Sequence, residues 1–268
     1  MPIITLLTDF GIQDGYPAAM KGVILSIASD VHLVDLTHDI PPQDVLQGAL
    51  TLRRLAPYFP PGTIHVGVVD PGVGTIRRPI AAHLGEHFFV GPDNGLVSLL
   101  ITKLEAHSIP IRFVHLDREE YWLPQVSRSF HGRDVFAPVA AHLARGVPLE
   151  QLGSPIEDLV RLDAPLPERL ENGWRAQVLH IDRFGNLALN LTEGEVGPTR
   201  SLRVLVGGIE IDGLSQAYGD RPTGELVALF DSSGCLSVAL VNGDAASRLQ
   251  VKVGDPVEVF FKDAGPDT

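Results

Sequence analysis

Residues 63–74 read TIHVGVVDPGVG, and they are the clearest indication of how the first half of the chain folds. The apolar and β-branched run Thr63–Val69 is typical of a strand buried on both faces. It ends at Asp70, and the glycines that follow favour a tight turn. A second run of this kind, Ile3–Thr8, ends at Asp9. Ligands of open α/β sheets bind beyond the carboxyl ends of the strands, so we expect Asp9 and Asp70 at the ligand-binding edge.

Helical and strand patterns alternate on both sides of that stretch. Apolar residues recur at helical spacing in four segments, and β-rich runs lie between them. The expected helices are 16–28, 44–55, 96–104 and 134–144, and the further strands are 31–36, 80–84, 87–90 and 111–115. Alternation of this kind favours a mainly parallel sheet with helices on both faces. The sequence therefore predicts a three-layer α/β domain over residues 1–163.

The pattern changes at DAPLPER, residues 163–169. Two prolines in a short polar stretch are typical of a linker, which we place at 164–169. Strand signals dominate afterwards, at 175–181, 187–191, 202–206, 209–211, 226–230, 236–241 and 257–261, with no long helical period. We therefore expect an all-β, barrel-like second domain over residues 170–262.

Composition excludes several classes of protein. The 268 residues include 21 basic and 33 acidic side chains, a formal net charge of −12, which disfavours nucleic-acid binding. The single cysteine, Cys235, cannot form an intrachain disulfide, as is usual in a reducing cytoplasm. The chain lacks both a basic, apolar leader pattern and an uninterrupted apolar run long enough for a membrane span. We expect a cytoplasmic protein without a membrane or nucleic-acid partner.

Three polar turns in the first half have a structural and a functional interpretation. Asp9 either ends its strand in an ordinary turn or binds a ribose diol, because a carboxylate can accept from both hydroxyls. Asp70 with the nearby Arg77 either forms a tight turn with a surface arginine or holds a charged site. His131, before a predicted helix, is either an incidental loop residue or a neutral imidazole that takes or steers a proton.

Other motifs favour no separate chemistry. The cluster His32, Asp35, His38 and Asp39 invites a metal-site interpretation, but strand alternation sends His32 and Asp35 to opposite faces, so a structural role is favoured. The chain has neither a Gly-x-Ser-x-Gly motif nor a phosphate-binding glycine loop. In the second half, IDRFGN at 181–186 is either a β-turn around Gly185 or a ligand-binding turn with an aromatic face, an amide and a carboxylate.

Six segments together resemble the S-adenosyl-L-methionine hydroxide adenosyltransferases, relatives of the fluorinating and chlorinating enzymes. They are TDFG at 8–11, VDLTHDI at 34–40, VGVVDPGVGTIRRPI at 66–80, GPDNGL at 91–96, SFHGRDVFAP at 129–138 and IDRFGNLALNL at 181–191. The resemblance spans nearly the whole chain. It implies hydrolysis of S-adenosyl-L-methionine to adenosine and L-methionine by attack of an activated water at ribose C5′. It implies no metal or other cofactor, and a homotrimer with each site between the N-terminal domain of one subunit and the C-terminal domain of its neighbour.

The resemblance also implies roles for individual residues. Asp70, Arg77 and His131 match the catalytic set, and the halogenating relatives lack that set. The remaining matches are Asp9 for ribose, Asp182 for the methionine ammonium, Phe184 and Asn186 for adenine, and Ser232 for the methionine carboxylate. Ser237 and Leu240 belong to the same expected substrate-binding set. They lie where this sequence departs from the family pattern, because Ser237 replaces the usual glutamate.

Two alternative functions remain at this point. A halogenase would make 5′-halo-5′-deoxyadenosine, and a non-catalytic protein would bind adenosine or S-adenosyl-L-methionine without turnover. Asp70 and His131 favour water over halide. Gly132 does so as well, because it stands where the fluorinating enzymes carry a halide-contacting serine.

Overall fold

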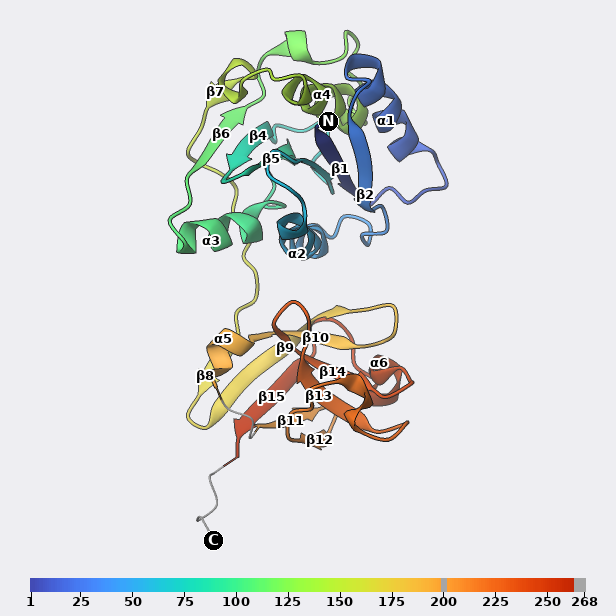
Figure 1. Ribbon diagram of the computed structural model, residues 1–268, viewed down its shortest axis with the longest axis vertical. Helices are drawn as coiled ribbons and strands as arrows, with labels where there is room; N and C mark the ends of the chain where they lie inside the picture. The colour runs from blue at the N-terminus through green and yellow to red at the C-terminus, as the bar shows by residue number, and fades with distance from the viewer. Residues whose placement is uncertain (199–201, 263–268) are drawn as a thin grey trace. The chain divides into compact units, whose positions relative to one another are not determined.

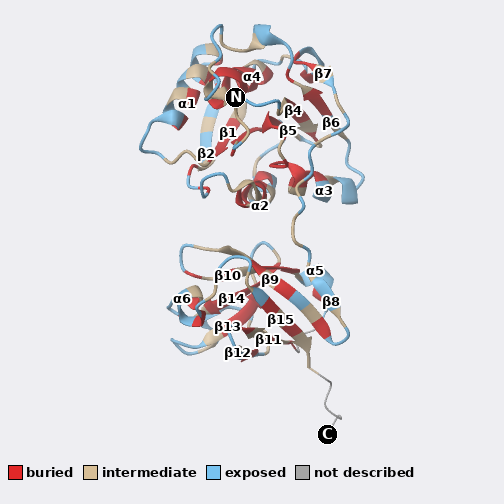
Figure 2. Cartoon of the chain, turned by 180° about the vertical axis from the view of Figure 1, so that it is seen from behind, coloured by how far each residue is buried: buried red, intermediate tan, exposed pale blue. Residues whose placement is uncertain are grey.

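The computed structural model describes residues 1–198 and 202–262, and the chain divides into two compact units at Ala164 and Pro165. Each unit has its own sheet and its own hydrophobic core. Figure 2 shows that the buried residues concentrate in the strands of each unit and on the inward faces of the helices. The two units are described in turn.

The first unit is built on a seven-stranded sheet of order β2-β1-β3-β5-β4-β6-β7. Its strands are β1 Ile3–Thr8, β2 His32–Thr37, β3 Ile64–Val68, β4 Pro79–Leu84, β5 His87–Pro92, β6 Ile111–His115 and β7 Ser154–Pro155. β1, β2, β3, β5 and β6 run in one direction, while β4 and β7 run in the other. The prediction of a mainly parallel sheet is confirmed.

Helices cover both faces of this sheet (Figure 1). The helices are α1 Tyr16–Ile27, α2 Val45–Leu55, α3 Ser98–Ala106 and α4 Ala137–Ala144, with a π-helical turn at Gly132–Phe136 and 3₁₀ turns at Ala56–Tyr58, Glu119–Tyr121 and Leu149–Gln151. α1 packs against α4, and α2 packs against α3. The three-layer α/β prediction is therefore confirmed.

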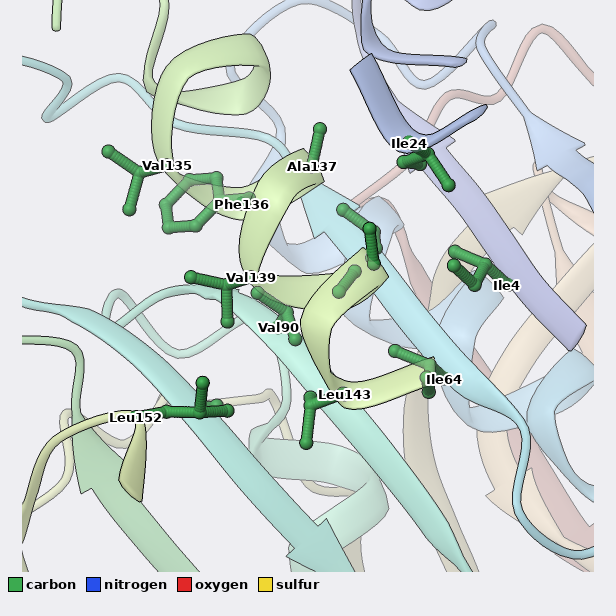
Figure 3. Packing of buried hydrophobic residues seen from close by; sticks show 14 of the residues in the cluster. Ile4, Ile24, Ile64, Val90, Val135, Phe136, Ala137, Val139, Leu143 and Leu152 are labelled. Carbon is green, nitrogen blue, oxygen red and sulfur yellow. The ribbon is translucent and has the colours of Figure 1, made fainter. Parts of the chain in front are cut away.

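Alternation along β1 sends side chains to both layers. Ile4 and Leu6 enter the core beneath α1 and α4, where Ile24 and Phe136 also lie (Figure 3). Leu7 enters the opposite core, beneath α2 and α3. Because β1 is buried on both faces, the polar residues that follow it collect at the end of the strand rather than along it.

The second unit is an antiparallel sheet of order β12-β11-β15-β9-β10-β14-β13, with β8 paired to β9. Its elements are β8 Glu168–Leu170, β9 Gly173–Ile181, β10 Leu187–Thr192, α5 Glu193–Val196, β11 Leu202–Val206, β12 Ile209–Asp212, a 3₁₀ turn Tyr218–Asp220, β13 Leu226–Phe230, β14 Cys235–Leu240, α6 Ala245–Leu249 and β15 Pro256–Phe261. The first and last strands of the path, β12 and β13, also contact each other. The sheet is thus nearly closed, which confirms the barrel-like prediction.

Several local features differ from the sequence expectation, among them one strand and the start of two helices. β8 lies partly within the segment expected as a linker, at Glu168 and Arg169, and it is short because only three residues pair with β9. The helix expected from Leu96 begins at Ser98. The helix expected from Asp134 is preceded by the π-helical turn. In the part of the chain that the structure describes, no helix is long and apolar enough to cross a membrane.

Candidate functional site

Three polar side chains converge at the carboxyl end of β3. Arg77 Nε lies 3.0 Å from both carboxylate oxygens of Asp70, and Arg77 Nη2 lies 2.5 Å from Asp70 Oδ2. The same Nη2 lies 3.0 Å from Nδ1 of His131. The side chains of Arg77 and Asp70 are only 9% and 4% exposed. Arg77 is therefore the centre of a buried polar group, with Asp70 and His131 on one edge of its guanidinium.

The loop after β3 folds Arg77 back onto Asp70. Asn94 Nδ2 donates to the carbonyl oxygen of Val69 over 2.8 Å, which fixes the backbone immediately before Asp70. A Cβ atom on Gly72 would lie 3.1 Å from Cγ of Arg77, so the absence of a side chain there leaves room for the arginine. The turn between Asp70 and Arg77 thus lets the arginine fold back and form an ion pair with the aspartate at the end of β3.

A second glycine brings this loop against the segment that carries His131. Gly74 has φ of +76°, and a Cβ atom there would lie 2.4 Å from the carbonyl oxygen of Arg128. Only glycine combines that backbone conformation with so close an approach. The contact holds the Asp70–Arg77 loop beside the His131 segment.

The π-helical turn sets the position of His131, which immediately precedes the turn and makes no side-chain capping bond to it. Phe136, in the same turn, is fully buried, and its ring lies 5.3 Å from Arg77 Cζ. Asp134 is buried and accepts from Ser127 N and Ser127 Oγ over 2.8 and 2.7 Å. The turn that follows His131 is thereby fixed to the preceding loop.

Electrostatics favour the neutral form of His131. Burial lowers the pKa of its imidazole, and the neighbouring guanidinium of Arg77 lowers it further, against the opposite effects of Asp70 and Asp134. An arginine can only donate, so His131 Nδ1 must accept from Arg77 Nη2. A neutral imidazole with an accepting Nδ1 carries its proton on Nε2.

One donor of the arginine is left over. Arg77 Nη1 is buried and has no hydrogen-bond partner within residues 1–198 and 202–262. A buried donor without a partner costs about 1–3 kcal/mol, so such groups are usually satisfied by a ligand or water. Asp70, Arg77 and His131 together can hold a small polar molecule at Nη1.

Asp9 lies in a turn beside this group. Its Oδ2 accepts from Gln43 N over 2.7 Å, and the residue is half-buried. The neighbouring Phe10 packs edge-on against Phe130, with ring centroids 5.8 Å apart. Because Phe130 directly precedes His131, the first unit brings the Asp9 turn and the His131 turn into contact.

In the second unit, the turn between β9 and β10 holds three of the predicted residues. Asp182 Oδ1 accepts from Phe184 N and Asn186 N over 2.8 and 2.9 Å, and Asp182 Oδ2 accepts from Asn186 Nδ2 over 2.9 Å. These bonds leave the Phe184 ring outside the turn, where the residue is 75% exposed. The turn therefore presents an aromatic ring next to a carboxylate.

The other three predicted residues of this unit lie on β13–β14 and their connection. Ser232 is exposed, next to Asp231, which accepts from the backbone N of Ser233 over 2.8 Å. Ser237 is buried, and its hydroxyl donates to the carbonyl oxygen of Leu187 over 2.8 Å, so it holds β14 against β10. Leu240 is half-buried at the end of β14.

Sequence reasoning missed Tyr218. Partial burial raises the pKa of its hydroxyl, and the nearby charges of Asp231 and Asp182 raise it further. Tyr218 thus lies near both the Asp182 turn and the Asp231 turn. The sequence offers one indication of it: Tyr218 is an aromatic residue within AYGDR at 217–221, a stretch that belongs to no predicted strand or helix.

The cluster on and after β2 holds no metal-type arrangement. In the described ranges, no group of three or more His, Cys, Asp or Glu side chains could hold an ion. His38 instead lies between Asp35 and Thr8, with Nε2 3.0 Å from Asp35 Oδ1.

Comparisons with known proteins find matches to both units of the chain. The family model described as the S-adenosyl-L-methionine hydroxide adenosyltransferase N-terminal domain matches residues 4–153, and that of the C-terminal domain matches residues 176–258. An (R)-S-adenosyl-L-methionine hydrolase of Salinispora arenicola is 42% identical, covering 96% of this chain and 97% of the relative. A fluorinase of Nocardia brasiliensis is 30% identical, covering 96% of each chain. A crystal structure of a conserved protein from Thermotoga maritima superposes with a TM-score of 0.88 at 34% identity, covering 96% of this chain and 99% of that one.

Proposed function

The chain belongs to the S-adenosyl-L-methionine hydroxide adenosyltransferase family, and we propose that Asp70, Arg77 and His131 form its catalytic set. The enzyme is an S-adenosyl-L-methionine hydrolase that forms adenosine and L-methionine. Two relatives named as (R)-S-adenosyl-L-methionine hydrolases are 42% and 41% identical to it over nearly the full chain, whereas a relative named as a fluorinase is 30% identical.

The reaction is a displacement at ribose C5′. The oxygen of a water forms the new C5′–O bond while the C5′–S bond breaks, and the bonding electron pair stays on sulfur. The sulfonium therefore leaves as a neutral thioether, L-methionine. Because the leaving group is already activated, the enzyme has only to position and polarise the water. The reaction needs no metal or other cofactor.

Arg77 Nη1 is the group that holds this water. The single observation behind the proposal is that Nη1 is buried and without a partner in the described part of the chain, beside Asp70 and His131. Positive charge beside the water stabilises the hydroxide character that develops as the C5′–O bond forms. Asp70 and His131 together hold Arg77 through Nε and Nη2, which leaves Nη1 for the water.

Asp70 accepts the proton that the water loses. The one acceptor nitrogen of neutral His131 is occupied by Arg77, so His131 cannot take a proton in this arrangement. The carboxylate of Asp70 keeps free lone pairs beside its bonds to Arg77. The proton thus moves from the water to Asp70 and then to solvent, and the reaction balances as water plus sulfonium giving alcohol, thioether and one proton.

The remaining assignments complete a substrate site. Asp9 binds the ribose hydroxyls, Phe184 stacks on adenine beside Asn186, Asp182 binds the methionine ammonium and Ser232 its carboxylate. The enzyme is a cytoplasmic homotrimer in which these two sets of residues come from adjacent subunits. Family likeness supports the trimer, and light scattering tests it: the mass should be three times the 28.9 kDa of one chain.

Two substitutions test the catalytic set. Asp70→Ala and His131→Ala should each lower kcat by about 10²-fold or more, since each disturbs the polarised water. Both should bind adenosine as the wild type does, because neither residue contacts the purine. Asp30→Ala, at an exposed position, is the matched control. Full turnover in both variants would refute the set, and a 5′-halo product formed in added fluoride or chloride would identify a halogenase.

A further inference from the structure

His38, in the segment VDLTHDI, is a buried histidine that the proposed reaction does not use. It follows β2 directly and is 6% exposed. Its Nε2 lies 3.0 Å from Asp35 Oδ1, and its Nδ1 lies 2.9 Å from Oγ1 of Thr8, which is fully buried. Asp35 in turn pairs with Lys21 over 2.6 Å. A continuous line of polar contacts thus runs from the surface to the end of β1.

The line ends at the turn that carries Asp9. The backbone N of Phe10 donates to Thr8 Oγ1 over 3.2 Å, and the backbone N of Gly11 donates to the carbonyl oxygen of His38 over 2.8 Å. Asp9 itself accepts from Gln43 N. Both residues that follow Asp9 are therefore bound to the Thr8–His38 pair, one through the threonine hydroxyl and one through the histidine backbone.

Thr8 can join His38 to the Asp9 turn because its hydroxyl both donates and accepts. Nε2 of His38 lies 3.0 Å from Asp35 Oδ1, but within residues 1–198 and 202–262 it has no hydrogen-bond partner. When Nδ1 of His38 accepts from the hydroxyl of Thr8, the oxygen of Thr8 remains free to accept from Phe10 N. This arrangement satisfies the buried threonine hydroxyl fully and fixes its rotamer, and a fixed rotamer holds the turn at a single geometry.

We propose that His38, acting through Thr8, is a positioning residue that sets the carboxylate of Asp9 for the ribose diol. The inference rests on the proposed function, because it assumes that Asp9 binds ribose. It gives a role to the segment VDLTHDI at 34–40, which contributes no residue to the set of Asp70, Arg77 and His131. Loss of the Thr8–His38 bond should weaken nucleoside binding rather than the chemical step, since Asp70, Arg77 and His131 lie on other loops.

Thr8→Val tests this role with little change of shape. It removes the hydroxyl that links His38 to Phe10 and keeps the β-branched side chain. The affinity for adenosine should fall about tenfold, the usual effect of one lost hydrogen bond, while kcat changes by less than about threefold. Thr5→Val is the matched control, because Thr5 is a buried threonine of the same strand whose hydroxyl also contacts a histidine, His65, over 2.8 Å. It should leave adenosine affinity unchanged.

A nucleoside that lacks one ribose hydroxyl distinguishes a misplaced Asp9 carboxylate from a general loss of protein stability or binding. Wild type should bind 3′-deoxyadenosine more weakly than adenosine, and Thr8→Val should discriminate between them much less. Adding Thr8→Val to Asp9→Asn should cause no further loss, because both changes remove the same contact. His38→Leu should behave as Thr8→Val does, with His32→Leu on β2 as its control.

The outcomes separate this inference from the function on which it rests. If wild type hydrolyses S-adenosyl-L-methionine while Thr8→Val binds adenosine as Thr5→Val does, this inference fails alone. Additive losses in the Asp9→Asn double variant would also overturn it. If wild type neither turns over S-adenosyl-L-methionine nor binds adenosine, the proposed function fails and this inference with it.

Discussion

Arg77 organises the candidate site at the level of single residues. Its Nε and Nη2 are taken by Asp70, and Nη2 is shared with His131. The planar guanidinium can make all of these contacts at once and still leave Nη1 for a ligand, whereas the ammonium of lysine cannot. The site therefore depends on the shape of the guanidinium as well as on its charge.

Arg77→Lys tests this dependence. The substitution keeps the positive charge but loses the contact to His131 and the donor at Nη1. We expect kcat/KM to fall about 10²–10³-fold, the usual cost of one preorganised donor. Steady-state kinetics measure the change, and Arg54→Lys, at an exposed position of α2, controls for the chemical change itself. Activity within a few-fold of wild type would show that charge alone suffices.

The protonation state of His131 leads to a prediction about pH. Burial and Arg77 lower its pKa below the ordinary value of 6.5, so the neutral form persists into mildly acidic solution. Protonation would place a proton on Nδ1 and expel Arg77 Nη2. Activity should therefore be lost as pH falls, with any loss due to His131 lying below pH 6.5. His131→Asn keeps an acceptor for Arg77 and should remove that part of the kcat/KM profile. A profile unchanged by His131→Asn would contradict this assignment.

At the level of elements, two loops must meet for the site to exist. Gly74→Ala would place a Cβ atom 2.4 Å from the carbonyl oxygen of Arg128, at a φ of +76°. Gly62→Ala meets the same kind of backbone strain, at a φ of +82°, but has no atom within 4 Å. Both should lose about 1 kcal/mol or more of stability. Only Gly74→Ala should also lower kcat strongly, since it separates Arg77 from His131. Equal kcat values for the two variants would show that the close approach is unimportant.

How well each helix or strand was predicted from the sequence depends on the length of its hydrophobic pattern. The run Ile3–Thr8 predicted its strand to the residue, because burial on both faces leaves few alternatives, whereas the runs 31–36 and 236–241 were each shifted by one residue from β2 and β14. β8 and α5 were missed because three- and four-residue elements carry no period. The π-helical turn before α4 was missed because helical spacing cannot distinguish it from an α-helical turn.

The site was predicted less completely than the fold. Its residues came from family resemblance, since Asp70, Arg77 and His131 have no spacing that links them. The folded-back arginine depends on Gly72 and Gly74, and neither the unpartnered Nη1 nor the acceptor role of His131 Nδ1 is visible in a linear pattern.

At the level of the whole molecule, buried histidines link stability to pH. Burial, with a smaller effect of His87, lowers the pKa of His65 to about 3. An unfolded chain takes up that proton near pH 6.5, so it binds more protons than the folded chain at lower pH. Stability therefore falls as pH falls from 6.5 towards 3, by about 1.4 kcal/mol per pH unit from this residue.

His65→Gln should reduce that dependence. Between pH 7.5 and 5, wild type should lose about 2 kcal/mol more stability than the variant, because only wild type must keep His65 neutral. Urea unfolding at the two pH values measures the difference. Exposed His32 is the matched position, and His32→Gln should behave as wild type. An equal loss in wild type and His65→Gln would show that other groups control acid stability.

The most direct test of the account is the fate of the water oxygen. Wild type and Asp70→Ala would each be incubated with S-adenosyl-L-methionine in ¹⁸O-labelled water. The masses and amounts of their products would then be compared by mass spectrometry. The account predicts one labelled oxygen in the 5′-hydroxyl of adenosine, none in L-methionine, and little product from the variant. Unlabelled adenosine, or equal labelled product from Asp70→Ala, would contradict it.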